Sequence, residues 1–331
     1  MATKRCAPSE TDYSTLSVFS YRSRVVARSL PLAQLPVAAH VIIYSLFGPL
    51  KDSMFSFSLV DSGCCFLLDE SYAETFDAIV GSFVKSGSQI YTCLYIHECS
   101  TSRRGSEVAG TLSTLTAQLA QNALPVLSMT TIARNFLLVH EQHATKALSI
   151  LQSIIEKKTR KSDPQAASSD NSGLPPCAEL RTPQLVVLPP SICICTLALK
   201  ELHVCAHALI WMLQLKPGKY LTHVFEMGGE VSLMFESESL DELAMHHPES
   251  AAALLAAAGT TLERDWRAVR MNELAGADTF GILSRVSVPL ASLPMMNVST
   301  LDTNLFLLKG HTLNHACELL ATHNFVVRRD D

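Results

Sequence analysis

The feature that most constrains the fold is a unit that occurs four times along the 331-residue chain. In each copy a short apolar segment leads directly into a stretch whose apolar residues recur at helical spacing, as at Ala147, Leu151 and Ile155. A repeated unit of this kind predicts an architecture of similar supersecondary modules. The apolar segments are 70, 95 and 74 residues apart and begin at Phe66, Phe136, Val231 and Leu305.

The longer middle interval contains a polar stretch, residues 156–182, that is rich in Ser, Pro, Asp and Lys. This composition favours a flexible linker, and removing about 25 residues for it makes the three spacings similar. We therefore expect two halves of two modules each. The expected modules are residues 13–88, 89–156, 185–248 and 249–329, with the linker at 157–184.

Each module is expected to contain a hairpin and an opening strand before its apolar segment. The hairpin strands, followed by turns with Gly, Asn or Asp, are expected at 55–60, 126–131, 221–225 and 297–300. The opening strands are expected at 16–27, 90–96, 192–197 and 282–286, and the clearest intervening helices at 107–122 and 199–213. This order predicts the α+β class, with four ferredoxin-like βαββαβ modules that each place two helices on one face of an antiparallel sheet.

The composition indicates extensive burial, because 17% of the residues are charged and 48% are apolar. Such a chain is too apolar for intrinsic disorder. With a formal net charge of −5 it also lacks the basic excess of a dominant nucleic-acid surface. A ferredoxin-like module of about 70 residues leaves one sheet face uncovered and its edge strands unpaired. We therefore expect the modules to pair through their sheets.

An uncharged stretch at residues 29–50 reaches the length of about 20 residues that spans a bilayer. It contains Pro31, Pro36 and His40, which are costly in a lipid-facing helix, so we expect a buried helix and no membrane contact. The first 15 residues lack the apolar run of a secretory signal. Ten cysteines in a chain of this length do not indicate a disulfide framework, and the expected location is the cytoplasm. Five of them are expected to be buried thiols: Cys64, Cys65, Cys193, Cys195 and Cys205.

The candidate constellations for catalysis or metal binding carry little signal. His203 and His207 lie four residues apart, as do His311 and His315, but neither pair has further ligands at the spacing of a zinc site. The sequence contains no nucleophile-elbow, phosphate-loop or dinucleotide-binding glycine motif. We therefore expect no metal, no cofactor and no enzymatic activity.

Two segments carry a resemblance to a known family. Residues 124–142 (LPVLSMTTIARNFLLVHEQ) and 266–271 (WRAVRM) resemble strands of the CASTOR, or GATS-like, family of cytosolic arginine sensors, which are tandem ACT-domain proteins. The resemblance extends from about Leu16 to Leu320. It implies four ACT-type modules packed as two tandem pairs, with arginine bound between the second and fourth. It further implies a homodimer whose association with a GATOR complex, upstream of the target-of-rapamycin kinase, depends on the ligand.

The resemblance also implies site residues by position. The implied ligand site comprises Pro125, Val126, Gly276, Asp278, Thr279, Phe280, Gly281, Ile282, Thr300, Leu301, Asp302 and Asn304, and the implied partner contacts are Ile132, Ala133 and Asn135. Pro125, Thr279 and Asn304 replace a serine and two acids of the family's pocket. Because a buried cation needs a paired charge, the identity of the amino acid stays open.

Three functions therefore remain at this point. The first is a non-catalytic sensor or adaptor that binds a free amino acid, either arginine or another. The second is an interaction scaffold that works without a ligand. The third is an ACT-type regulatory subunit of an enzyme of amino-acid metabolism.

Overall fold

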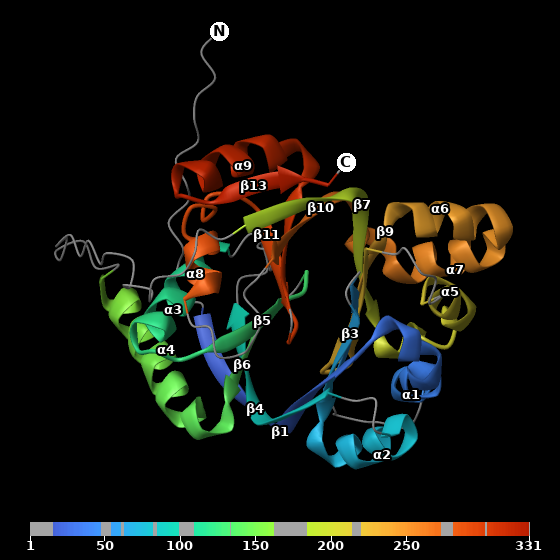
Figure 1. Cartoon of the computed structure of the whole chain (residues 1–331), viewed down its shortest axis with the longest axis horizontal. Helices are drawn as coiled ribbons and strands as arrows, with labels where there is room; N and C mark the ends of the chain where they lie inside the picture. The colour runs from blue at the N-terminus through green and yellow to red at the C-terminus, as the bar shows by residue number, and fades with distance from the viewer. Residues whose placement is uncertain are drawn as a thin grey trace, which may run out of the picture.

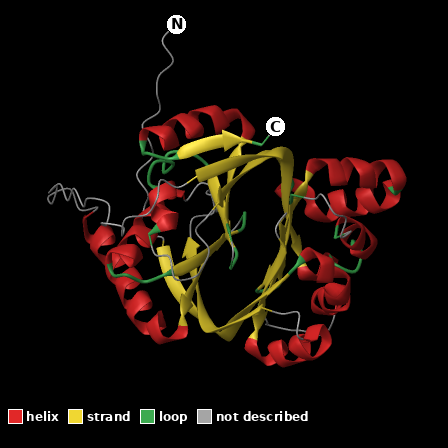
Figure 2. Cartoon of the chain, viewed as in Figure 1, coloured by secondary structure: helices red, strands yellow, loops and turns green. Residues whose placement is uncertain are grey.

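The computed structural model describes residues 16–47, 54–60, 63–81, 85–98, 109–132, 134–161, 184–213, 220–272, 281–301 and 303–330. Within these ranges the strands form one continuous sheet, and the helices lie outside it (Figures 1 and 2). The structure confirms a mixed protein of helices and antiparallel strands. Four separate ferredoxin-like modules are not confirmed, because the sheet is continuous across all of the predicted boundaries.

The elements of the first half of the chain are β1 (Leu16–Leu30), α1 (Leu35–Phe47), β2 (Phe55–Val60), β3 (Gly63–Asp69), α2 (Glu70–Val80), β4 (Lys85–Glu98), α3 (Ala109–Gln121), β5 (Val126–Thr130), β6 (Asn135–His140) and α4 (Glu141–Lys161). Those of the second half are β7 (Gln184–Ala198), α5 (Ala206–Met212), β8 (Leu221–Met227), β9 (Glu230–Glu236), α6 (Ser237–His246), α7 (Pro248–Ala258), β10 (Glu263–Asn272), α8 (Ile282–Ser287), β11 (Met295–Ser299), β12 (Asn304–Lys309), α9 (Leu313–Thr322) and β13 (Val326–Arg329).

The sheet closes on itself. In the described part of the chain its order is β10-β12-β11-β5-β6-β4-β1-β3-β2-β8-β9-β7, and β7 pairs with β10 to complete the ring. Strand β13 joins outside the ring, parallel to β7. In the described part of the chain, strands of the two halves pair at two seams. One seam is β2–β8, paired along six residues, and the other is β5–β11, where Val298 pairs with Met129.

Closure gives the protein cores on both sides of the sheet. The clusters on the outer side contain helix residues, whereas two further clusters contain residues of strands and their adjoining segments and none from a helix, so they fill the inside of the ring. Inside, the rings of Phe136 and Phe225 lie 4.7 Å apart although they come from opposite halves. Strands buried on both faces need few charged residues, and this burial accounts for the low charged fraction.

Long strands connect neighbouring groups of elements. In β1, Val25 to Leu30 pair with β3, whereas Leu16 to Ser20 pair with β4 and have no partner in β3. Strand β4 pairs with β1 over most of its length and with β6 at Tyr91 to Ile96. The predicted boundary between residues 88 and 89 therefore falls inside β4. The strand orders β4-β1-β3-β2 and β1-β4-β6-β5 overlap, and so do β10-β7-β9-β8 and β7-β10-β12-β11.

Three sequence-based assignments of elements were wrong. Residues 282–286 form helix α8 and not an opening strand, which is instead β10. The apolar run is too short for its length to distinguish a buried helix from a strand. Gly281, in the left-handed conformation (φ +85°), precedes the run and marks the start of the helix. The predicted helix at 199–213 is interrupted before α5. Helix α4 continues to Lys161, so the linker does not begin at residue 157; residues 162–183 lie outside the described residues.

Two expectations about burial are confirmed. The uncharged stretch at 29–50 contains α1, which buries Leu35, Val41 and Leu46. Burial raises the pKa of the Cys64 and Cys195 thiols to about 12, so both stay protonated and unreactive.

No helix in the described part of the chain combines the length and apolar character needed to cross a bilayer.

The packing inside the ring is tested by Phe225→Ala. We expect the free energy of unfolding in urea to fall by about 3–5 kcal/mol, because the cavity would lie where the two halves touch. The control is Ile210→Ala on α5, where the wild-type side chain is 46% exposed; the expected change there is about 0.5 kcal/mol or less. Equal effects of the two substitutions would contradict a packed interior.

Glu226 of β8, at the β2–β8 seam, predicts that the stability of the protein depends on pH. Burial raises the pKa of Glu226 to about 7 from its usual 4.5, so the folded state binds more protons between these values and loses stability as the pH rises through them. Glu226→Gln removes this loss. We expect the stability of the variant relative to wild type to increase by roughly 2–3 kcal/mol between pH 4.5 and pH 8 in urea unfolding. A constant difference across this range would contradict the burial of this carboxyl group.

Candidate functional site

The β5–β11 seam carries polar side chains on its outer face. Val126 of β5 packs against two clusters that contain helix residues, whereas Met129 belongs to an inner cluster. Because side chains alternate along a strand, Ser128 and Thr130 point outward with Val126. On β11 the same alternation places Asn297 and Ser299 outward. All four are at most 2% exposed, so a buried polar strip follows the seam.

Two helices cover this strip. Helices α3 and α8 pack against each other across the seam (Figure 1). Gly281, just before α8, lies against α3, where an added Cβ would be 3.6 Å from the Cβ of Ala120. The helices bring further buried hydroxyl groups, which bond to their own backbone. Thr116 donates to the carbonyl of Leu112 at 2.8 Å, and Ser284 donates to that of Gly281 at 2.9 Å.

The polar groups on the β11 side of the seam have partners. Ser299 Oγ donates to Asn304 Oδ1 at 2.6 Å, and Asn297 Nδ2 donates to the carbonyl of Leu305 at 3.2 Å. The turn that follows β11 is fixed by the backbone N–H of Thr303, which donates to Thr300 Oγ1 at 3.0 Å. These bonds fix the orientation of the amide and hydroxyl groups at the seam.

The β5 side differs, because two of its hydroxyl groups have no partner among the described residues. Ser128 Oγ and Thr130 Oγ1 are buried and make no hydrogen bond to any residue that the structure describes. A buried polar group without a partner costs about 1–3 kcal/mol, and such groups are rare in folded proteins. The two hydroxyls are therefore positioned to bind a polar group that enters the seam.

The structure brings several of the sequence-predicted ligand residues to this seam. Val126 begins β5, and Asn304 contacts Ser299. Gly281 precedes α8, and Ile282 begins it. Leu301 packs instead against an inner cluster, inside the ring. The remaining described members are Pro125, which precedes β5, and Thr300, which follows β11. Outside the described residues lie Gly276, Asp278, Thr279, Phe280 and Asp302. Ligand binding itself stays a prediction.

The predicted partner contacts lie beside the same strands. Ile132 and Asn135 are buried, at 7% and 3% exposure, and Ala133 lies outside the described residues. Partner binding at these positions also stays a prediction.

Sequence reasoning missed Ser128, Thr130, Asn297 and Ser299. Hydroxyl and amide residues are common in strands, so none of them is conspicuous alone. The signal is their alternation with apolar residues in LSMT and MNVS. Only the pairing of β5 with β11 brings the polar residues of the two strands together into one strip.

In each histidine pair, one imidazole lies close to a polar side chain elsewhere on the surface. His207 Nδ1 lies 2.9 Å from Ser250 Oγ, and His315 lies 3.9 Å from Glu318. Within the described residues there is no group of three or more His, Cys, Asp or Glu side chains placed to hold a metal ion.

Neither a protein-family model nor a curated protein matches the chain. Solved structures that align with it include aspartate kinase from Synechocystis, with 10% identity over 93% of this chain and a TM-score of 0.35. The chain spans 55% of the length of that kinase.

Two further solved structures, of an aspartate kinase and of a regulatory subunit, also align with the chain. The regulatory subunit of aspartate kinase from Thermus thermophilus in its ligand-free form aligns with 12% identity, 42% of this chain, 95% of that chain and a TM-score of 0.29. Aspartokinase III from E. coli, in complex with aspartate and ADP, aligns with 12% identity, 44% of this chain, 35% of that chain and a TM-score of 0.31. At these TM-scores the likeness assigns neither a family nor a function to this chain.

The unpartnered hydroxyls predict an unusual response to mutation. Thr130→Val keeps the shape of the side chain and removes its buried hydroxyl, so we expect the free energy of unfolding without ligand to stay level or rise by up to about 1 kcal/mol. In the control Ser58→Ala, the wild-type hydroxyl lies 2.8 Å from His223 Nδ1, and its loss lowers stability by about 1–3 kcal/mol. A comparable loss in both variants, measured in urea, would show that Thr130 has a partner.

Proposed function

We propose that the chain is a non-catalytic regulator that binds a free amino acid at the β5–β11 seam. The observation that carries this proposal is the pair of buried, unpartnered hydroxyls of Ser128 and Thr130. They lie where the two halves of the chain meet, under α3 and α8. A ligand held there would contact both halves, and its binding energy would favour the closed arrangement of the ring over any more open one.

The chemistry of the strip suits the α-amino and α-carboxyl groups of an amino acid. Serine and threonine hydroxyls donate to a carboxylate, and Ser128 and Thr130 are available for this role. The amide oxygens of Asn297 and Asn304 accept hydrogen bonds, so an α-ammonium group would find acceptors on β11 and at the start of β12. Figure 1 shows β5 and β11 side by side, which allows one small molecule to bridge them.

The described side chains of the strip favour a neutral ligand side chain. Ser128, Thr130, Asn297 and Ser299 carry no charge. A buried guanidinium would need a paired carboxylate, and none of these four side chains supplies one. The proposal therefore favours an amino acid with an uncharged side chain over arginine, which the sequence resemblance implied.

Four ferredoxin-like units remain the proposed interpretation of the continuous sheet. The order β4-β1-β3-β2 and its counterpart β10-β7-β9-β8 correspond to two such units. The other two use the opposite ends of the same long strands, in the orders β1-β4-β6-β5 and β7-β10-β12-β11. In this interpretation the second and fourth ACT-type modules meet at β5–β11, which is the proposed ligand seam.

The sequence resemblance supplies the wider proposal, that the ligand changes association with a protein partner of GATOR type upstream of the target-of-rapamycin kinase. A homodimer belongs to the same proposal. Purification of the chain from cells followed by mass spectrometry tests the partner proposal. A co-purifying GATOR-type complex would support it, whereas a co-purifying metabolic enzyme would favour the regulatory-subunit alternative.

A thermal-shift and calorimetric screen of the twenty amino acids tests ligand binding. We expect at least one neutral amino acid to bind, with a stabilisation of about 2.7 kcal/mol when its concentration is a hundred times the Kd. The double variant Ser128→Ala/Thr130→Val is expected to bind it about tenfold more weakly. The control Ser149→Ala removes an exposed hydroxyl on α4 and should bind as wild type does. Binding of none of the twenty would overturn the proposal.

A further inference from the structure

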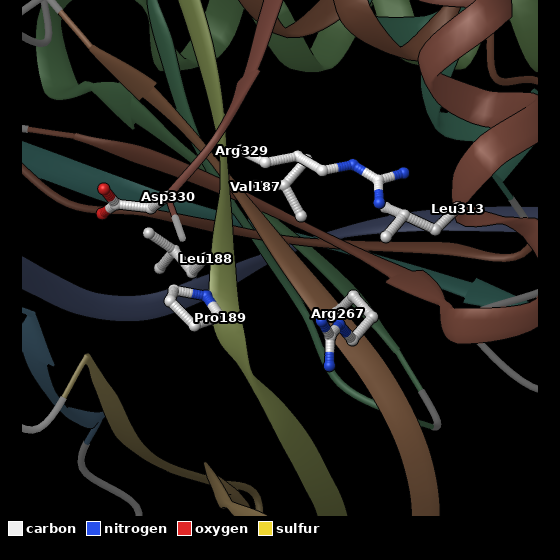
Figure 3. Close-up of a pocket in the computed structure, with 7 residues that line it drawn as sticks. All are labelled: Val187, Leu188, Pro189, Arg267, Leu313, Arg329 and Asp330. Carbon is white, nitrogen blue, oxygen red and sulfur yellow. The ribbon is translucent and has the colours of Figure 1, made fainter.

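A pocket of about 250 Å³ lies on the outer side of the sheet, where β7, β10 and β13 meet the start of α9 (Figure 3). Its apolar wall is formed by Val187, Leu188, Pro189 and Leu313. None of its lining residues belongs to the β5–β11 seam. The pocket therefore requires an explanation of its own.

The pocket arises from an interruption of the strand pairing. β7 pairs with β10 up to Val187 and resumes at Ser191, with a shift of register between them. Pro189 and Pro190 lie in this gap, and proline has no N–H to donate to a ladder. On the other side of β7, the pairing with β13 ends at Arg329, opposite Val187. Both neighbours separate from β7 at the same position, which leaves the hollow.

Two arginines enter this hollow from different strands. Arg267 comes from β10 and Arg329 from β13 (Figure 3). Arg329 donates one hydrogen bond to Asn314 Oδ1 at 2.6 Å, which leaves most of its five N–H donors available. Arg267 is half-buried and makes no hydrogen bond or ion pair with the residues that the structure describes. A half-buried guanidinium without a partner is suited to bind an anion.

We propose that this pocket binds a small carboxylate. The planar fork of arginine matches a carboxylate group, and the apolar wall accommodates a short aliphatic body. Ligand pockets commonly measure about 300–1,000 Å³, so this smaller one suits a molecule no larger than an amino acid. Asp330 lies at the rim. Its charge disfavours a dianion such as phosphate and favours a carboxylate that also carries an amino group.

Ligand-observed NMR on the full chain tests this site with four probes: propionate, alanine, propylamine and inorganic phosphate. The background is Ser128→Ala/Thr130→Val, in which any binding at the seam is about tenfold weaker, and the arginine variants below separate the pocket from the seam. We expect binding of propionate and tighter binding of alanine, whereas propylamine and phosphate bind at least about tenfold more weakly than alanine. Absence of binding by both carboxylates would overturn the site without affecting the seam.

Variants locate the binding. Arg267→Gln is expected to weaken the binding of propionate and of alanine about tenfold, which corresponds to about 1.4 kcal/mol of binding free energy. The matched control Arg264→Gln removes the same charge from the same strand, at an exposed position that lies 3.6 Å from Asp241, and should leave both affinities unchanged. Asp330→Asn should abolish the preference for alanine over propionate. Equal losses of affinity in Arg267→Gln and Arg264→Gln would show that only net charge matters, and would contradict binding in this pocket.

Discussion

The rest of the structure depends on the closure of the sheet between the two halves of the chain. Without the β2–β8 and β5–β11 pairings, each half would expose edge strands and an apolar inner face. Closure places Phe136 against Phe225 and buries residues on both sides of the strands. It explains why only 17% of the residues are charged, and it creates a polar seam where a small ligand would contact both halves under α3 and α8.

The two seams use the same backbone pairing for different purposes. At β2–β8 the outer face carries Phe57, Leu59 and Val224 in an apolar cluster, and the inner Ser58 is bonded to His223. At β5–β11 the outer face carries hydroxyl and amide groups, two of which lack a partner in the described structure. An apolar seam stabilises the ring by itself. Buried hydroxyls without a partner cost stability, and this difference between the seams supports the proposed binding role of the second.

The sequence predicted most individual elements, because local patterns determine them. The hairpins at β2–β3 and β8–β9 and the helix in the uncharged stretch follow from spacing and turn residues. It did not predict that β1, β4, β7 and β10 each serve two groups, since sharing a strand leaves no local signal. The apolar run after Gly281 was ambiguous because it is too short to distinguish a buried helix from a strand. At the site, Val126 and Asn304 were found through the resemblance, whereas Ser128 and Thr130 became conspicuous only through burial and the cross-seam pairing.

Hydrogen exchange of the backbone amides, with and without the amino acid that binds, tests the central claim most directly. A ligand in the β5–β11 seam predicts slower exchange in residues 126–130 and 295–299 and in the covering α8, with the β2–β8 seam changing little. The reduction should disappear in Ser128→Ala/Thr130→Val. Protection confined to the β2–β8 seam, or no change at either seam despite measured binding, would contradict the assignment of the ligand to β5 and β11.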